Sequence, residues 1–241
     1  MAKKKSSKQL AKKKSSSKKA GLTSAEKDFV RVHGGALLSE DRGSFNTMTI
    51  LIHGTLDASN PWYQPGSSFH NFVRRLYPND YFEMDSTVDF HWRPALPNRF
   101  SRWAGGEKLL HFCQAYHLSH GIQSFRLIGH SHGATVASIC SNRLISSSYT
   151  WRIKQLVMLS PLEWQFFPND HLPNLSAVEN HEFFNLHPEQ DRIVQPKRQN
   201  FQQVPHLRNF EREFVLDGLI GHWLPTMEYY WTTSGFDQAV S

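Results

Sequence analysis

Residues 125–134 constrain the fold of this chain more than any other stretch. A short apolar run leads into Gly-His-Ser-His-Gly, centred on Ser131, and a helical pattern of small residues follows. This G-x-S-x-G order between a strand and a helix is typical of a sharp turn that holds a serine at its tip. Larger side chains at Gly129 and Gly133 would collide with the neighbouring strand and helix. The pattern therefore predicts a Ser131 hydroxyl that projects from a sheet, beside helix N–H groups that favour an anion.

Apolar runs alternate with helical patterns on both sides of this turn. The predicted strands cover residues 47–53, 88–92, 125–128, 153–159, 182–186 and 213–216. The predicted helices cover residues 68–76, 106–117, 134–146 and 226–231. This alternation favours an α/β fold with a mostly parallel central sheet that is flanked by helices on both faces. The length of 241 residues suits one such domain, which we expect to span residues 25–241.

Residues 1–24 differ in composition from the rest of the chain. The first 20 residues contain nine lysines and no acidic residue, and without them the remaining net charge is about −3. A Lys/Ser-rich segment buries too little surface to offset its chain entropy, so we expect a disordered basic tail. Such a tail either contacts a polyanion, such as nucleic acid or an anionic membrane, or simply keeps the protein in solution.

The two cysteines and the hydropathy pattern bear on the compartment. Cys113 and Cys140 lie among apolar residues in helical patterns, which indicates buried thiols rather than a disulfide. The sequence contains no transmembrane segment and no hydrophobic secretory signal at its N-terminus. We therefore expect a cytoplasmic protein, whose oligomeric state the sequence leaves open.

A serine nucleophile needs a carboxylate that orients its base. Asp191 follows the predicted strand 182–186 by a few residues, where the carboxyl end of a parallel strand would place it near Ser131. Glu189 and Asp217 are alternative acids.

The base itself is expected later in the chain. His222 lies in a glycine-flanked loop after the predicted strand 213–216, and His187 and His206 are the alternatives. The order serine, acid, histidine is the one used with a G-x-S-x-G turn on a parallel sheet.

The turn at Ser131, the acid, the late histidine and a His-Gly-Thr turn at residues 53–55 together resemble the α/β-hydrolase superfamily, over roughly residues 47–230. The resemblance implies a catalytic triad of Ser131, Asp191 and His222, with no cofactor. It also implies an oxyanion hole formed by the backbone N–H groups of His132 and Thr55, with Leu56 as the alternative to Thr55. The implied reaction is hydrolysis of an acyl or lipid ester, a small-molecule or lipid substrate, through an acyl-enzyme.

Other functions fit the same residues. A thioesterase, a peptidase or an acyltransferase would use the same triad. Ser131 is also an acceptable helix N-cap, and a non-catalytic hydrolase-like protein tethered by its lysine tail would need no triad.

Two further groups of residues have alternative interpretations. The aromatic residues Trp62, Tyr63, Trp164 and Phe167 follow predicted strand ends and either line an acyl-binding groove or belong to the core. His130 and His132 superficially resemble a metal-binding pair, but no cysteine or carboxylate near them completes a ligand set, so we expect no metal site.

Overall fold

A computed structural model describes residues 45–55, 61–92, 99–161, 172–188, 208–212 and 222–241. Within these ranges, five strands form one parallel sheet in the order β1-β2-β3-β4-β5, which is also their order along the chain. They are β1 (Thr47–Ile52), β2 (Ser124–His130), β3 (Arg152–Leu159), β4 (Phe183–Pro188) and β5 (Arg208–Arg212). The predicted α/β class is confirmed. The predicted tail, residues 1–24, and the first part of the predicted domain lie outside the described residues.

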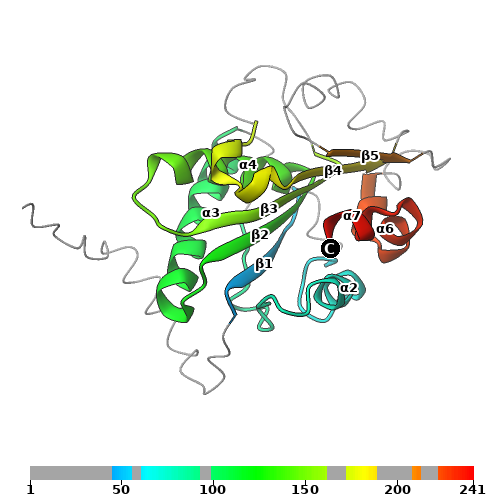
Figure 1. Ribbon diagram of the computed structural model, residues 1–241, viewed down its shortest axis with the longest axis horizontal. Coiled ribbons are helices and arrows are strands. Elements are labelled where there is room, and N and C mark those ends of the chain that lie inside the picture. Colours follow the sequence, from blue (N-terminus) through cyan, green and yellow to red (C-terminus); the bar gives the residue numbers. More distant parts are fainter. Residues whose placement is uncertain (1–44, 56–60, 93–98, 162–171, 189–207, 213–221) are drawn as a thin grey trace, which may run out of the picture.

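Helices cover both faces of the sheet (Figure 1). One face carries α3 (Arg99–His120) and α4 (His132–Ser146), which pack against each other, and the short 3-10 helices η3 (Leu175–Ala177) and η4 (Glu179–His181) lie beside them. The other face carries α2 (Ser68–Leu76), η7 (Leu224–Thr226), α6 (Glu228–Ser234) and α7 (Phe236–Val240).

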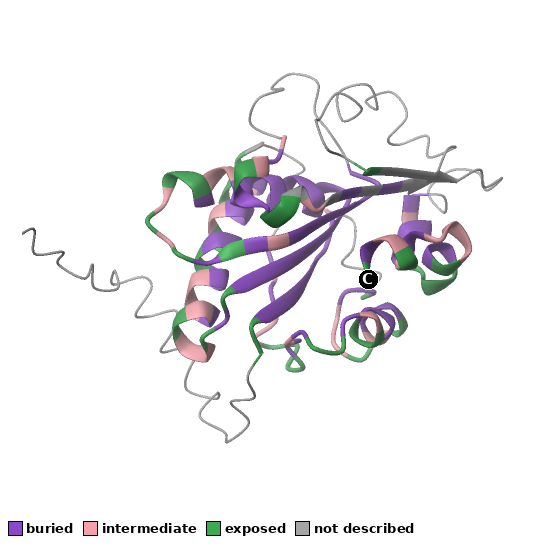
Figure 2. Cartoon of the chain, in the orientation of Figure 1, coloured by how far each residue is buried: buried purple, intermediate pink, exposed green. Residues whose placement is uncertain are grey.

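Alternation along the strands divides the apolar side chains between two cores. Phe125 and Leu127 of β2 belong to the core under α3 and α4, whereas Ile128 belongs to the core under α2, α6 and α7. Successive residues of a strand point to opposite faces, and both faces of β2 are buried, which explains its nearly continuous apolar sequence. Figure 2 shows the strands β1, β2 and most of β3 as buried along their length.

A buried polar network connects the second face of the sheet to α7. The Arg126 guanidinium donates to Asp80 Oδ2 at 2.9 Å and lies 3.6 Å above the ring of Tyr77. The carbonyl of Val240 accepts from Gln155 Nε2 at 2.9 Å and from the Tyr77 hydroxyl at 3.2 Å. Buried charges are tolerated where partners satisfy them, and here the partners also hold α7 against the sheet.

Several predicted elements differ in position. Residues 88–92 are not a strand, because Asp85 and Asp89 bond to nearby backbone N–H groups and favour a turn. Instead, Tyr81 forms a single parallel bridge with Met48 of β1. The helix predicted at 106–117 begins earlier, at Arg99, and the last helix, predicted at 226–231, is η7 followed by α6. The strand predicted at 213–216 lies outside the described residues, and the described strand in this part of the chain is β5.

The two cysteines are buried free thiols, as predicted, on α3 and α4. In the described part of the chain, no helix combines the length and apolar character needed to cross a membrane.

The loop before α3 should make the stability of the fold depend on pH. Burial raises the pKa of the Asp89 carboxyl to about 7, with the N–H of Phe90 opposing and Glu83 adding to the shift. Because this pKa lies above that of the unfolded chain, the stability it contributes is present at low pH and lost as pH rises from about 4 to about 7. We expect Asp89→Asn to raise the free energy of unfolding by about 1–3 kcal/mol at pH 8 and by almost nothing at pH 4.

Urea unfolding at the two pH values measures this difference. Asp85→Asn is the matched control, because hydrogen bonds from Thr87 lower the pKa of the exposed Asp85 carboxyl. That substitution should not stabilise the protein at pH 8. An Asp89→Asn variant with the same stability gain at both pH values would contradict the prediction.

Candidate active site

Ser131 occupies the tip of a sharp turn between β2 and α4. Its backbone has φ 54° and ψ −124°, a conformation that few residues other than glycine adopt. Its N–H donates to the carbonyl of Leu159 at 2.9 Å, which ties the turn to the end of β3. The side chain of Ser131 makes no cap hydrogen bond to α4. The N-cap alternative therefore does not explain this serine, and a strained backbone at a strand end is typical of a functional site.

The two glycines of the motif are required by close approach. A Cβ atom at Gly129 would lie 2.7 Å from the backbone of Ala134, and one at Gly133 would lie 2.1 Å from the carbonyl oxygen of Ile52. Both distances are far below van der Waals contact. The collisions that the sequence predicts for larger residues at Gly129 and Gly133 are therefore confirmed by the structure.

The turn at residues 53–55 is fixed by its neighbours. His53 Nδ1 donates to the carbonyl of Gly54 at 2.9 Å, and the ring of Tyr63 stacks on the His53 ring with centroids 4.7 Å apart. The indole N–H of Trp92 donates to the carbonyl of His53 at 2.8 Å. His53 thus serves the turn as a buried structural hydrogen-bonding group.

The structure brings Thr55 and His132 together. The Thr55 hydroxyl and His132 Nδ1 are 2.6 Å apart, which joins the turn after β1 to the first residue of α4. An N–H at the first position of a helix has no acceptor within the helix. The two segments predicted to supply oxyanion donors therefore meet beside Ser131.

His222 lies at the same end of the sheet, and only 3% of it is exposed. Its backbone carbonyl accepts from His130 Nε2 at 2.9 Å, and the two imidazole rings lie 4.8 Å apart. The bond from His130 joins the backbone of His222 to the turn. Among the described residues, no hydrogen bond runs directly from the His222 imidazole to the Ser131 hydroxyl. Catalytic hydrogen bonds often tighten only when substrate binds.

The predicted acids cannot be located in the same way. Asp191 and its alternatives Glu189 and Asp217 lie outside the described residues, as does His206. His187 lies on β4, and only its backbone is described.

The predicted aromatic residues divide in two. Trp62 and Tyr63 are each 5% exposed and belong to the core under α2, α6 and α7. Their burial favours the core interpretation, and contact with a substrate stays a prediction. Trp164 and Phe167 lie outside the described residues.

The side chains of His130 and His132 form hydrogen bonds to different groups. His130 bonds to the carbonyl of His222 and His132 to the Thr55 hydroxyl, so the two side chains have different partners on different segments. In the ranges that the structure describes, no group of three or more His, Cys, Asp or Glu side chains is arranged to hold a metal ion.

Comparison with solved structures identifies the fold. A protein from Xanthomonas campestris pv. campestris, named as a putative hydrolase of the alpha/beta superfamily, matches with a TM-score of 0.52 and 15% identity, over 80% of this chain and 97% of that one. The chain has the α/β-hydrolase fold. A protein from Thermoplasma acidophilum, named as a predicted CIB-like hydrolase, matches with a TM-score of 0.49 and 12% identity, over 82% of this chain and 88% of that one. No family model matches the chain, and no curated protein matches it.

For two residues near the turn of this α/β-hydrolase fold, the sequence did not predict the structural role that they have. His130 is completely buried and contacts the His222 segment. Ser160, directly after β3, has φ 43°, and its buried hydroxyl has no hydrogen-bond partner among the residues that the structure describes. Pro161 gives no signal for this conformation of Ser160, because the residue before a proline favours extended backbone.

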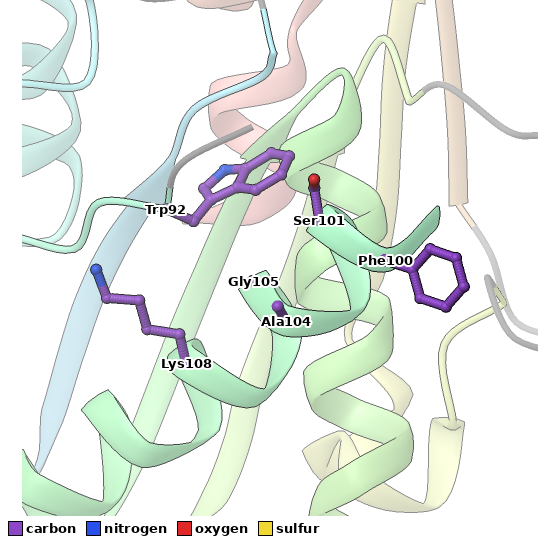
Figure 3. A pocket seen from close by; sticks show the side chains of 6 residues that line it. All are labelled: Trp92, Phe100, Ser101, Ala104, Gly105 and Lys108. Carbon is purple, nitrogen blue, oxygen red and sulfur yellow. The ribbon is translucent and has the colours of Figure 1, made fainter. Parts of the chain in front are cut away.

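A cavity of about 500 Å³ lies on the α3 side of this α/β-hydrolase fold (Figure 3). Its lining consists of Trp92, Phe100, Ser101, Ala104, Gly105 and Lys108. Trp92 also holds the turn after β1, but no residue of the Ser131 turn lines the cavity. We therefore assign this cavity no part in the chemistry considered below.

Proposed function

We propose that the protein is a serine hydrolase that cleaves a carboxylic ester, either an acyl or a lipid ester, through an acyl-enzyme. The observation that carries this proposal is the strained Ser131 at the strand end, with His222 bonded to the residue that precedes it. A nucleophile and a base from distant parts of the chain thus share one end of the sheet.

In the proposed reaction, Ser131 Oγ attacks the ester carbonyl while the His222 imidazole takes the hydroxyl proton. The resulting oxyanion accepts hydrogen bonds from the backbone N–H groups of His132 and Thr55. His222 returns the proton to the leaving alcohol, and the ester carbonyl becomes bonded to Ser131. Water, activated by the same imidazole, then releases the acid. Asp191 holds the His222 tautomer that this sequence of steps requires, and no cofactor takes part.

The electrostatics of the site support this assignment. Ser131 precedes the first residue of α4, a 15-residue helix, so the positive end of the helix dipole faces the charge that would form. Ser131 and His132 are each only 6% exposed, and in such a site a hydrogen bond to an anion is stronger than in water.

A fluorophosphonate probe tests the proposal. The purified chain should be labelled once, and mass spectrometry of its peptides should place the label on Ser131. A panel of p-nitrophenyl esters with increasing acyl length should then show turnover. Labelling at another serine, or none, would contradict the mechanism.

The leaving group separates the alternatives on the same triad. Comparing one acyl group as an oxygen ester, a thioester and an amide distinguishes esterase, thioesterase and peptidase activity, and adding a competing alcohol reveals acyl transfer. A cytoplasmic location, which the two buried free thiols support, and contact of the lysine tail with a polyanion remain part of the proposal.

The bond between Thr55 and His132 gives a further prediction. Thr55→Val removes the hydroxyl that joins the two oxyanion segments, and Thr55→Ser keeps it. We expect Thr55→Val to lower kcat about 5-fold, because losing a hydrogen bond of this kind costs about 1 kcal/mol, and to leave KM nearly unchanged. Steady-state kinetics on the best ester measure the effect. A Thr55→Ser variant as slow as Thr55→Val would show that the hydroxyl is not responsible.

A further inference from the structure

We infer that His130 is a positioning residue, which anchors the backbone of His222 to the strand that carries the nucleophile. This inference rests on the proposed function, in which His222 is the general base. The sequence offers no role for His130, because the residue between Gly129 and Ser131 in the motif can be of any type.

The place of His130 in the sheet makes this anchor rigid. It is the last residue of β2, directly before Ser131, and none of its surface is exposed. Along β2, Ile128 lies in the core under α2, α6 and α7, and Arg126 bonds to Asp80 on that side. Alternation along a strand directs the side chain of His130 to the same face, where η7 and α6 follow His222 in the chain.

The hydrogen bond places a hydrogen on Nε2 of the His130 ring. His130 Nε2 lies 2.9 Å from the carbonyl oxygen of His222. A carbonyl oxygen can only accept, so Nε2 must carry the hydrogen and donate it. Nε2 of His130 is therefore committed to the backbone of His222 and does not serve as the base for Ser131.

Ring contacts hold the His130 imidazole from several sides. Its centroid lies 4.8 Å from the ring of His222, 4.9 Å from that of Trp223 and 5.8 Å from that of Trp62. Trp62 approaches edge-on, at 83°. His130 therefore connects the segment after β1, the nucleophile turn and the His222 segment.

This arrangement sets the position of the base relative to the nucleophile. A single peptide bond separates the anchor from Ser131, whereas 92 positions separate the two partners of the anchoring bond. A shift of about 1 Å in a catalytic group can cost about 100-fold in rate. Releasing the His222 carbonyl should therefore slow the chemical step more than it weakens substrate binding.

The experiment compares two substitutions at position 130. His130→Gln keeps an N–H donor near the place of Nε2, whereas His130→Leu fills a similar volume without a donor. We expect His130→Leu to lower kcat about 10- to 100-fold with KM within about twofold, and His130→Gln to recover most of the loss. Melting temperatures of both variants are measured alongside the kinetics.

A second buried histidine provides the matched control. His70 of α2 lies on the same face, is 4% exposed and packs its ring against Phe82 at 5.6 Å. His70→Leu should leave kcat within about twofold of the wild type, because losing a contact remote from the reacting groups changes stability rather than chemistry.

Two outcomes would overturn the inference: a wild-type kcat in His130→Leu, or equal losses in the Leu and Gln variants. Should His130→Leu fail to fold, His130→Asn replaces it, because the shorter amide withdraws the donor from the His222 carbonyl. Activity that survives in Ser131→Ala would instead refute the proposed function, so the two failures are distinguishable.

Discussion

Replacing Ser131 by alanine should lower ester turnover by about 10⁶-fold, the loss typical of removing the nucleophile of such a triad, and should abolish fluorophosphonate labelling. The fold should be unaffected. The serine side chain makes no cap hydrogen bond to α4, and alanine carries the same Cβ, so the strained backbone is no harder to adopt. We expect the free energy of unfolding to change by less than about 0.5 kcal/mol.

Ester hydrolysis and urea unfolding on the same preparation check both halves of this prediction. His222→Asn is the companion variant and should lose activity to a similar degree, because members of a triad act as a unit. Turnover within 100-fold of the wild type in Ser131→Ala would contradict the mechanism. A loss of about 1 kcal/mol in stability would indicate a capping role for the serine.

Gly133→Ala should have the largest effect on the fold. The added Cβ would lie 2.1 Å from the carbonyl oxygen of Ile52 and 2.6 Å from that of His53. Both atoms belong to the backbone and cannot rotate away, so α4 would have to move from the end of β1. We expect a destabilisation of at least about 3 kcal/mol, at the upper end of the cost of overpacking a core. The protein that still folds should be at least about 100-fold less active, since Thr55 and His132 move apart.

Two other glycines provide controls for this substitution. Gly66 and Gly121 have φ of 87° and 73°, but no atom of the described ranges lies within 4 Å of a Cβ at either position. Alanine there should cost only about 1–2 kcal/mol of backbone strain and leave kcat unchanged. If Gly133→Ala were no less stable than Gly121→Ala, close approach would not be the reason for glycine at position 133.

Local steric rules explain what could be predicted from the sequence. The turn at Ser131 follows from residue sizes within five positions, and the strands β1 to β3 follow from apolar runs that are buried on both faces. The apolar residues at 88–92 predicted a strand wrongly, because two aspartates nearby bond to the backbone and favour a turn.

The arrangement around His222 could not be predicted in this way. The partner of His130 is a backbone carbonyl 92 positions away, and a carbonyl is present at every residue, so no sequence pattern marks it. The same holds for the choice among acids: Asp191, Glu189 and Asp217 all follow strands, and only their distances to His222 can decide between them.

The order of the strands has a consequence for how the protein is made. Each strand pairs with the one synthesised just before it, so the sheet can grow from one edge as the ribosome delivers the chain. Its second face, with Val157, Leu159 and Phe184, is covered by Trp231 and Phe236, which are translated after all five strands. His222, the proposed general base, is translated in the same late stretch. While residues 222–241 are still missing, a nascent chain therefore leaves exposed the part of this face that Trp231 and Phe236 cover, and their addition closes this core and brings in His222 at the same stage.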